Sequence, residues 1–254
     1  MPAHERLAAL SQQTAAPMAG QQPSLCVACS GASSAEASLP AAIGSADQPE
    51  LTAGAAELRR MLAVIEDEII PKTRVGVAEG NKVFGAAVLD SRLATIVADT
   101  NHEMESPLFH GEVYVLNRWA AETPAAERGS SAANAIFLST HEPCCMCISS
   151  LVWAGFTKVF YFFPYEATTS QGIPYDVEII HELWRVPTYA KRNKYCAAAP
   201  VQELIEALPD GEEKAALVAQ SLVRAHAQLP AGAGSGAGAG AGTRAGQIDL
   251  QGCS

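Results

Sequence analysis

Two short segments of this chain carry the residue types that bind zinc, and any fold must bring them together. The first is His110-Gly111-Glu112, and the second is Pro143-Cys144-Cys145-Met146-Cys147. Zinc prefers four tetrahedral ligands drawn from Cys and His, and a catalytic zinc site uses three protein ligands and leaves the fourth position for water. The side chains of His110, Cys144 and Cys147 supply three such ligands. The pattern therefore predicts a Zn2+ site with one open position.

The local structure expected of both segments suits a zinc site. Cys144 and Cys147 are three residues apart, which places them on one face of a helix. Pro143 suits a first helical turn, and the positive end of that helix favours the thiolate form. Glu112 follows His110 by two residues, so we expect its carboxylate to transfer protons beside the metal without binding it. A C-x-x-C pair alone also occurs in structural zinc sites and redox centres, and a lone His or Glu is usually structural. The catalytic interpretation therefore depends on the two motifs occurring together.

Residues 61–184 resemble the cytidine deaminase-like superfamily, with its CMP/dCMP-type zinc deaminase domain. Within it, the chain is similar to the branch of cytosine, guanine and tRNA adenosine deaminases. Three stretches carry the resemblance: residues 80–88, His110-Gly111-Glu112 and residues 142–147. The resemblance implies a zinc-dependent hydrolase that acts on C–N bonds of cyclic amidines. Such an enzyme removes an exocyclic amino group from a nucleobase or small nucleoside, of cytosine or guanine type, and releases ammonia; Glu112 would be its catalytic acid–base.

The resemblance also implies which residues contact the substrate. Asn101 occupies the place of a base-binding asparagine, and an amide both donates and accepts hydrogen bonds. Asn81 is a second candidate, although asparagine in either place also suits a turn. The backbone at Gly111 is expected to approach the substrate closely. Phe109 and Trp184 are the aromatic candidates for stacking on the base.

Apolar periodicity predicts the fold of the middle of the chain. Residues 55–70, 110–121 and 144–154 have the pattern of helices, and residues 83–90, 93–99, 135–140 and 157–163 that of strands. Residues 176–185 are expected to form a strand that runs into a helix. This order predicts an α/β protein, a three-layer α/β/α domain with a mixed sheet. Both metal motifs then open helices near strand ends, where ligand sites tend to lie.

Composition divides the chain into four segments. Residues 1–50 are rich in Ala, Ser, Gln, Gly and Pro, and we expect a disordered leader or a transit segment. Residues 51–208 are expected to form the zinc-dependent deaminase domain, and residues 209–228 an appended helix. The Gly/Ala-rich residues 229–254 have the composition of a disordered tail.

Charge bears on the partners of the chain. The formal net charge is −10, which disfavours a nucleic-acid site, since such sites need a basic surface. The one basic cluster, residues 191–194, is interpreted as a solvated patch. A small-molecule nucleobase or nucleoside is therefore the expected partner. A tRNA adenosine-to-inosine deaminase is the alternative, and a non-catalytic zinc-stabilised binding domain is a third hypothesis.

Assembly and location are also expectations at this stage. The resemblance implies a homodimer or a larger homo-oligomer. No apolar run approaches the length of a membrane span. Thiolate ligands and cysteines without an evident pairing indicate a reducing compartment, so we expect a cytoplasmic location, or an organelle if the leader is a transit peptide.

Overall fold

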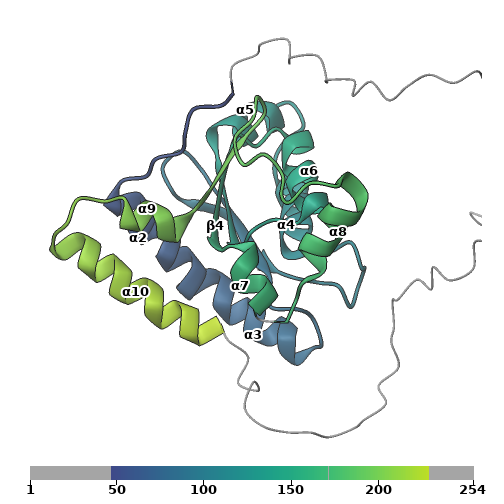
Figure 1. Ribbon diagram of the computed structural model, residues 1–254. Coiled ribbons are helices and arrows are strands. Elements are labelled where there is room, and N and C mark those ends of the chain that lie inside the picture. Colours follow the sequence, from purple (N-terminus) through teal and green to yellow (C-terminus); the bar gives the residue numbers. More distant parts are fainter. Residues whose placement is uncertain (1–46, 171, 229–254) are drawn as a thin grey trace, which may run out of the picture. The chain divides into compact units, whose positions relative to one another are not determined.

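The computed structural model describes residues 47–170 and 172–228 (Figure 1). The predictions made for residues 1–46 of the leader and for the tail, 229–254, concern residues outside this described part. Among the described residues, no helix has both the length and the apolar character that crossing a membrane requires.

A five-stranded mixed sheet forms the centre of the domain, in the order β2-β1-β3-β4-β5. Strand β1 runs antiparallel to its neighbours β2 and β3, whereas β3, β4 and β5 are parallel. The strands are β1 (Gly85–Leu89), β2 (Thr95–Thr100), β3 (Ile136–His141), β4 (Lys158–Phe163) and β5 (Ala197–Pro200). The predicted hairpin of β1 and β2 is present. Its turn is closed by Asp90, whose Oδ1 accepts hydrogen bonds from the backbone N–H groups of Arg92 and Ala94.

Helices cover both faces of this sheet, so the predicted α/β/α architecture is confirmed (Figure 1). One layer holds α2 (Ala55–Val64), the π-helical turn η1 (Ile65–Ile69), α3 (Ile70–Ala78), α9 (Val201–Glu206) and α10 (Glu212–Gln228). The other holds α4 (Gly111–Glu122), α5 (Arg128–Asn134) and α6 (Cys145–Ala154). Alternate residues of each strand serve the two cores: Ala87 and Leu89 pack toward the first layer, Ala86 and Val88 toward the second.

The first helical segment extends beyond its predicted end. Pro71 suggested a stop, but the chain continues through η1 into α3, where the proline occupies the first turn. Inside a helical run a proline removes one N–H donor, and the π-helical turn directly before Pro71 changes the hydrogen-bond pattern where that donor is missing. The π-helical turn thus joins α2 and α3 in one uninterrupted helical run, Ala55–Ala78.

Three elements differ from expectation in the last part of the domain. Residues 176–185, expected to begin as a strand, form the helix α8 (Tyr175–Trp184), which follows the short α7 (Tyr165–Ser170). Neither β5 nor α9 was predicted, because β5 consists of three alanines and a proline and has no alternating pattern. Helix α10 is present over the expected residues, and its Leu217 joins the core of the first layer.

Candidate metal centre and active site

The two zinc motifs meet where α4 and α6 begin. His110 is the N-cap residue of α4 and Cys144 that of α6, and α6 follows the end of β3 directly. The Sγ atoms of Cys144 and Cys147 are 3.5 Å apart. Nδ1 of His110 lies 3.6 Å from the Cys144 sulfur and 3.7 Å from the Cys147 sulfur. Two helix starts on neighbouring parts of the sheet thus bring the predicted ligands together.

These distances fit a tetrahedral zinc ion. Zn–S bonds of about 2.3 Å and Zn–N bonds of about 2.0 Å place a nitrogen and a sulfur ligand roughly 3.5 Å apart, and two sulfur ligands roughly 3.8 Å apart. Both cysteines are buried. The hydrogen bond from the Cys147 thiol, and after it the one from His110, lower the pKa of Cys144, which favours a thiolate. Within the described residues, these three side chains form the group suited to hold a metal ion.

Glu112 lies beside this group, in the first turn of α4. Its side chain is 4% exposed. The hydroxyl of Ser139 donates to Oε1 at 3.1 Å, and Oε2 lies 3.4 Å from Cys147 Sγ. Burial, and after it the charge of Cys144, raise the pKa of Glu112 to about 7. A carboxyl group with this pKa is suited to accept and return a proton near neutral pH.

The two asparagines predicted to contact the substrate both hold the loop before His110. Oδ1 of Asn101 accepts the backbone N–H of Glu103, and Oδ1 of Asn81 accepts that of Met104, both at 2.9 Å. Asn101 is fully buried, and its Nδ2 has no hydrogen-bond partner. A buried amide donor without a partner is rare in proteins, so Nδ2 of Asn101 is available to donate to a ligand. Both asparagines bond the loop only through Oδ1, and a substrate contact by Asn81 stays a prediction.

The structure gives Gly111 a steric role. A Cβ atom at this position would lie 2.9 Å from the Cα and 3.0 Å from the N of Gly85, in β1.

Phe109 is half-buried and packs edge-on against Tyr114, with ring centroids 5.4 Å apart. Trp184 is 46% exposed at the end of α8. Within the described part of the chain, the side chains of Phe109 and Trp184 form no hydrogen bond, ion pair or ring contact with His110, Cys144 or Cys147.

Sequence reasoning missed two acidic residues near the metal group. Oε1 of Glu103 lies 3.4 Å from Nε2 of His110 and 2.8 Å from Nζ of Lys82. Burial opposes ionisation of Glu103, but the hydrogen bonds of His110 and Lys82 outweigh it and hold its pKa below its usual value. In α8, burial and then the charge of Cys144 raise the pKa of Asp176 to about 6. No local pattern marks either residue, because each reaches the site only through tertiary folding.

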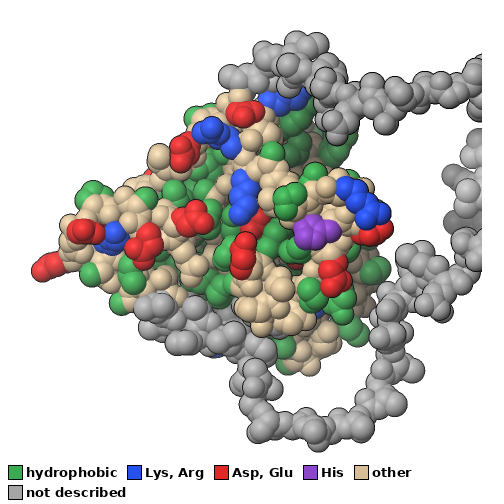
Figure 2. All heavy atoms as spheres, in the orientation of Figure 1, with side chains coloured by type: hydrophobic (Ala, Val, Ile, Leu, Met, Phe, Trp, Pro, Cys, Tyr) green, Lys and Arg blue, Asp and Glu red, His purple; other side chains and the backbone are tan. Residues whose placement is uncertain are grey.

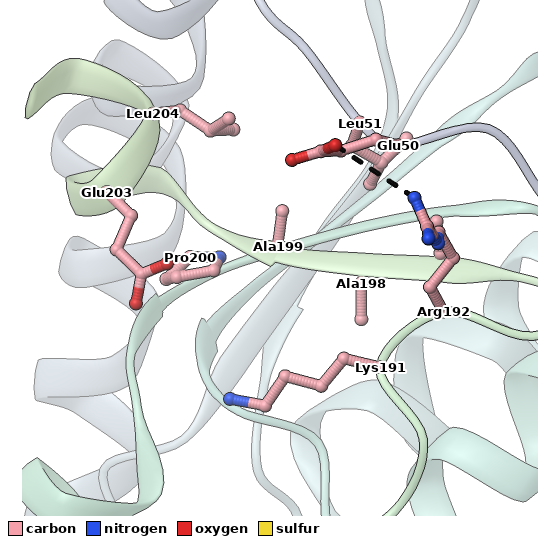
Figure 3. Close-up of a pocket in the computed structure, with 10 residues that line it drawn as sticks. Glu50, Leu51, Lys191, Arg192, Ala198, Ala199, Pro200, Glu203 and Leu204 are labelled. Atoms are coloured by element: carbon pink, nitrogen blue, oxygen red, sulfur yellow. Dashed lines mark ion pairs between the residues drawn. The ribbon is translucent and has the colours of Figure 1, made fainter. Parts of the chain in front are cut away.

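The basic cluster at residues 191–194 was predicted to be a solvated patch, but one of its side chains has a buried partner. Nζ of Lys191 pairs at 3.3 Å with the buried carboxylate of Glu142, next to the Pro143-Cys144 turn. Lys191 also borders a cavity of about 390 Å³ along β5, drawn in Figure 3, where the ion pair of Arg192 and Glu50 spans the other side. A buried carboxylate attracts a cation from the surface, which a charge count along the sequence does not reveal.

Comparison with known proteins finds a family model that matches part of the chain and includes both motifs. Residues 69–163 match the family model described as the cytidine and deoxycytidylate deaminase zinc-binding region. No curated protein matches the chain.

Several solved structures resemble the chain weakly. A guanine deaminase from Nitrosomonas europaea is 16% identical, with a TM-score of 0.40, over 71% of this chain and 88% of its own. A guanine deaminase from Bacillus subtilis is 22% identical, with a TM-score of 0.40, over 55% and 85% of the two chains. A structure from a study of tRNA:A34 deaminases is 18% identical, with a TM-score of 0.33, over 58% and 94%. Likeness at this level carries no argument about the substrate.

Proposed function

We propose that this chain, whose residues 69–163 match the zinc-binding region of cytidine and deoxycytidylate deaminases, is a zinc-dependent hydrolytic deaminase of a nucleobase or small nucleoside. The reaction exchanges an exocyclic amino group for oxygen: water adds, the C–N bond breaks, and ammonia leaves. The observation that carries the proposal is the buried carboxylate of Glu112, which lies beside the three metal donors and is not one of them.

The three donors fit a catalytic zinc site with one open position. Zinc held by His110, Cys144 and Cys147 would lower the pKa of water and so supply a nucleophile near neutral pH. The chain itself supplies a group that moves the protons. Glu112 accepts the proton that the attacking water loses and gives it to the ring nitrogen. It then accepts the proton of the newly added hydroxyl group and gives it to the departing amine, which leaves as ammonia. Ser139 donates to Oε1 of Glu112 and thereby orients the carboxylate for this transfer.

A structural zinc site does not explain this arrangement. Such a site is closed by four protein ligands, whereas three side chains form the metal group within the described residues. A carboxylate buried without a cation partner also costs free energy unless the site uses it. These observations favour a catalytic centre over a zinc-stabilised binding domain.

Asn101 supports a base as the substrate. Its Oδ1 is engaged by the loop, so the amide has a fixed orientation, and its buried Nδ2 is left to donate. The carbonyl oxygens and ring nitrogens of a nucleobase are acceptors for such a donor. Asn101 thus fits recognition of a base edge. We assign the substrate to the cytosine or guanine type on family resemblance, and the assay below tests it.

The charges of the chain favour a small substrate over tRNA. The formal net charge is −10. On the face shown in Figure 2, acidic and basic side chains are interspersed and form no basic stripe. Nucleic-acid sites generally need such a stripe, because phosphate contacts supply much of the binding free energy. Homodimerisation and a cytoplasmic location stay predictions from the sequence.

Ammonia release from a panel of substrates tests the proposal. The panel holds cytosine, guanine and adenine, their nucleosides, and a tRNA with adenosine at the wobble position. We expect turnover of at least one small substrate by the zinc-loaded chain. In Glu112→Gln, turnover should fall by roughly 10²–10⁴-fold, while zinc content stays that of the wild type.

Three results would contradict parts of this proposal. Turnover of tRNA alone would overturn the substrate class. Loss of zinc from Glu112→Gln would show that Glu112 is a ligand. Normal turnover by that variant would place the proton transfer elsewhere. Glu105→Gln is the matched control, since Glu105 is exposed on the loop before His110.

A further inference from the structure

We infer that Glu103 is a positioning residue of the metal centre: it accepts the Nε2–H of His110 and thereby directs the Nδ1 lone pair toward the metal ion. The inference rests on the zinc centre of the proposed function, but not on the identity of the substrate. It adds a residue that neither zinc motif contains, seven positions before the histidine.

The two nitrogens of the His110 ring face different partners. Nδ1 lies 3.6 and 3.7 Å from the sulfurs of Cys144 and Cys147. Nε2 lies 3.4 Å from Oε1 of Glu103 on the opposite side of the ring. A neutral imidazole carries its proton on one nitrogen and its free lone pair on the other, and a hydrogen bond at one nitrogen decides which. A carboxylate at Nε2 therefore selects the tautomer that binds metal through Nδ1.

Glu103 is itself held in place by two contacts, and its neighbour Met104 by a third. Its Oε1 pairs with Nζ of Lys82 at 2.8 Å, and its side chain is 17% exposed. Its backbone N–H donates to Oδ1 of Asn101, and the next N–H, of Met104, donates to Oδ1 of Asn81. These bonds determine the course of the loop, so the carboxylate is placed before any metal binds. Prior placement avoids the entropy cost of ordering it on binding.

A partner on the second ring nitrogen strengthens metal binding for a general reason. It fixes the orientation of the ring and makes the ligating nitrogen more basic, and loss of such a partner costs roughly 10–100-fold in metal affinity or activity. The ring of His110 also lies parallel to that of Phe84, with centroids 6.5 Å apart. This contact is apolar and cannot choose between tautomers, so the choice falls to Glu103.

The same loop links the metal centre to the amide proposed to bind the base. Asn101 accepts the N–H of Glu103 through Oδ1, which leaves Nδ2 as its free donor. Removal of only the Glu103 side chain leaves this backbone bond intact. Glu103→Ala should therefore change metal binding more than substrate binding, which separates a positioning role from general disruption of the loop.

Zinc affinity of the full chain, measured by competition with a chromophoric chelator, tests the inference. We expect Glu103→Ala to bind zinc about 10–100-fold more weakly than the wild type. Glu103→Gln should lie between the two, because its amide oxygen still accepts a hydrogen bond but carries no charge. Glu105→Gln, with the same charge change on the same loop, should stay within twofold. Absorption of the Co2+-substituted chain should shift in Glu103→Ala and stay unchanged in the control.

The possible outcomes are distinct. If Glu103→Ala binds zinc within twofold of the wild type and its Co2+ spectrum is unchanged, the inference is wrong. If that variant does not fold, the zinc affinities of Glu103→Gln and Lys82→Met test the inference instead. Both variants should bind zinc severalfold more weakly than the wild type, and wild-type affinity in both would overturn the inference. If the wild type binds zinc in this Glu103-dependent way but deaminates nothing, only the proposed function fails. If it binds no zinc, both fail.

Discussion

Replacement of Gly111 by alanine tests how closely α4 must approach the sheet. The new Cβ would lie 2.9 Å from the Cα of Gly85, 3.0 Å from its N and 3.1 Å from the carbonyl carbon of Phe84. All three are backbone atoms, which no side-chain rotation moves away. Ordinary contact begins near 3.4 Å, so the start of α4 has to shift by roughly half an ångström from β1.

Two opposing effects set the size of the change. Overpacking of this kind costs about 1–3 kcal/mol. Alanine in place of glycine in the middle of a helix stabilises by roughly 0.5–1 kcal/mol, and the gain at Gly111, the first residue of α4, should not exceed this. The net result should be a loss of about 1–2 kcal/mol in the free energy of unfolding. For a domain of this size, that corresponds to a fall in Tm of roughly 2–8 °C.

Thermal and urea unfolding of the zinc-saturated chain measure this loss. Gly129→Ala is the matched control, because Gly129 is helical and exposed and a Cβ there would meet nothing within 4 Å. The control should be as stable as the wild type or more stable by up to about 1 kcal/mol. If Gly111→Ala were as stable as Gly129→Ala, the close approach would not limit the fold and this reasoning would be refuted.

Three further predictions follow from single contacts. Cys147→Ala should lose stoichiometric zinc, seen by elemental analysis, and should unfold at lower temperature, because metal binding contributes folding free energy; retention of one zinc per chain would mean that Cys147 is no ligand. Asn101→Ala should lower kcat/KM at least fivefold while one zinc per chain remains, since it removes a buried donor; unchanged kcat/KM would exclude a substrate contact. Tyr165→Phe removes the 2.7 Å hydrogen bond to the carbonyl of Pro143 and should lower stability to urea by about 1–3 kcal/mol; an unchanged urea midpoint would show that the bond contributes nothing.

The sequence by itself determined the features that depend on local pattern. The spacing of Cys144 and Cys147 implied one helix face, and the structure has both at the start of α6. Alternating and helical apolar periods located β1 to β4, α4 and α10, since burial of one face acts on every residue of an element. The α/β/α fold class followed from their order. Weak elements such as β5, formed mostly of alanine, have no such periodicity and were missed.

Only the tertiary structure decided what surrounds the metal donors. Glu103 and Asp176 lie in a loop and a helix from which other residues were predicted to contact the substrate, but no pattern marked these two. Lys191 meets Glu142 across 49 positions of the chain. Gly111 is required by the backbone of Gly85, a contact between two segments with no shared pattern. The physical reason is common to all of them. A ligand motif is selected by the chemistry of its own residues, whereas the orientation and electrostatics of those residues are set by whichever groups the packed core brings next to them.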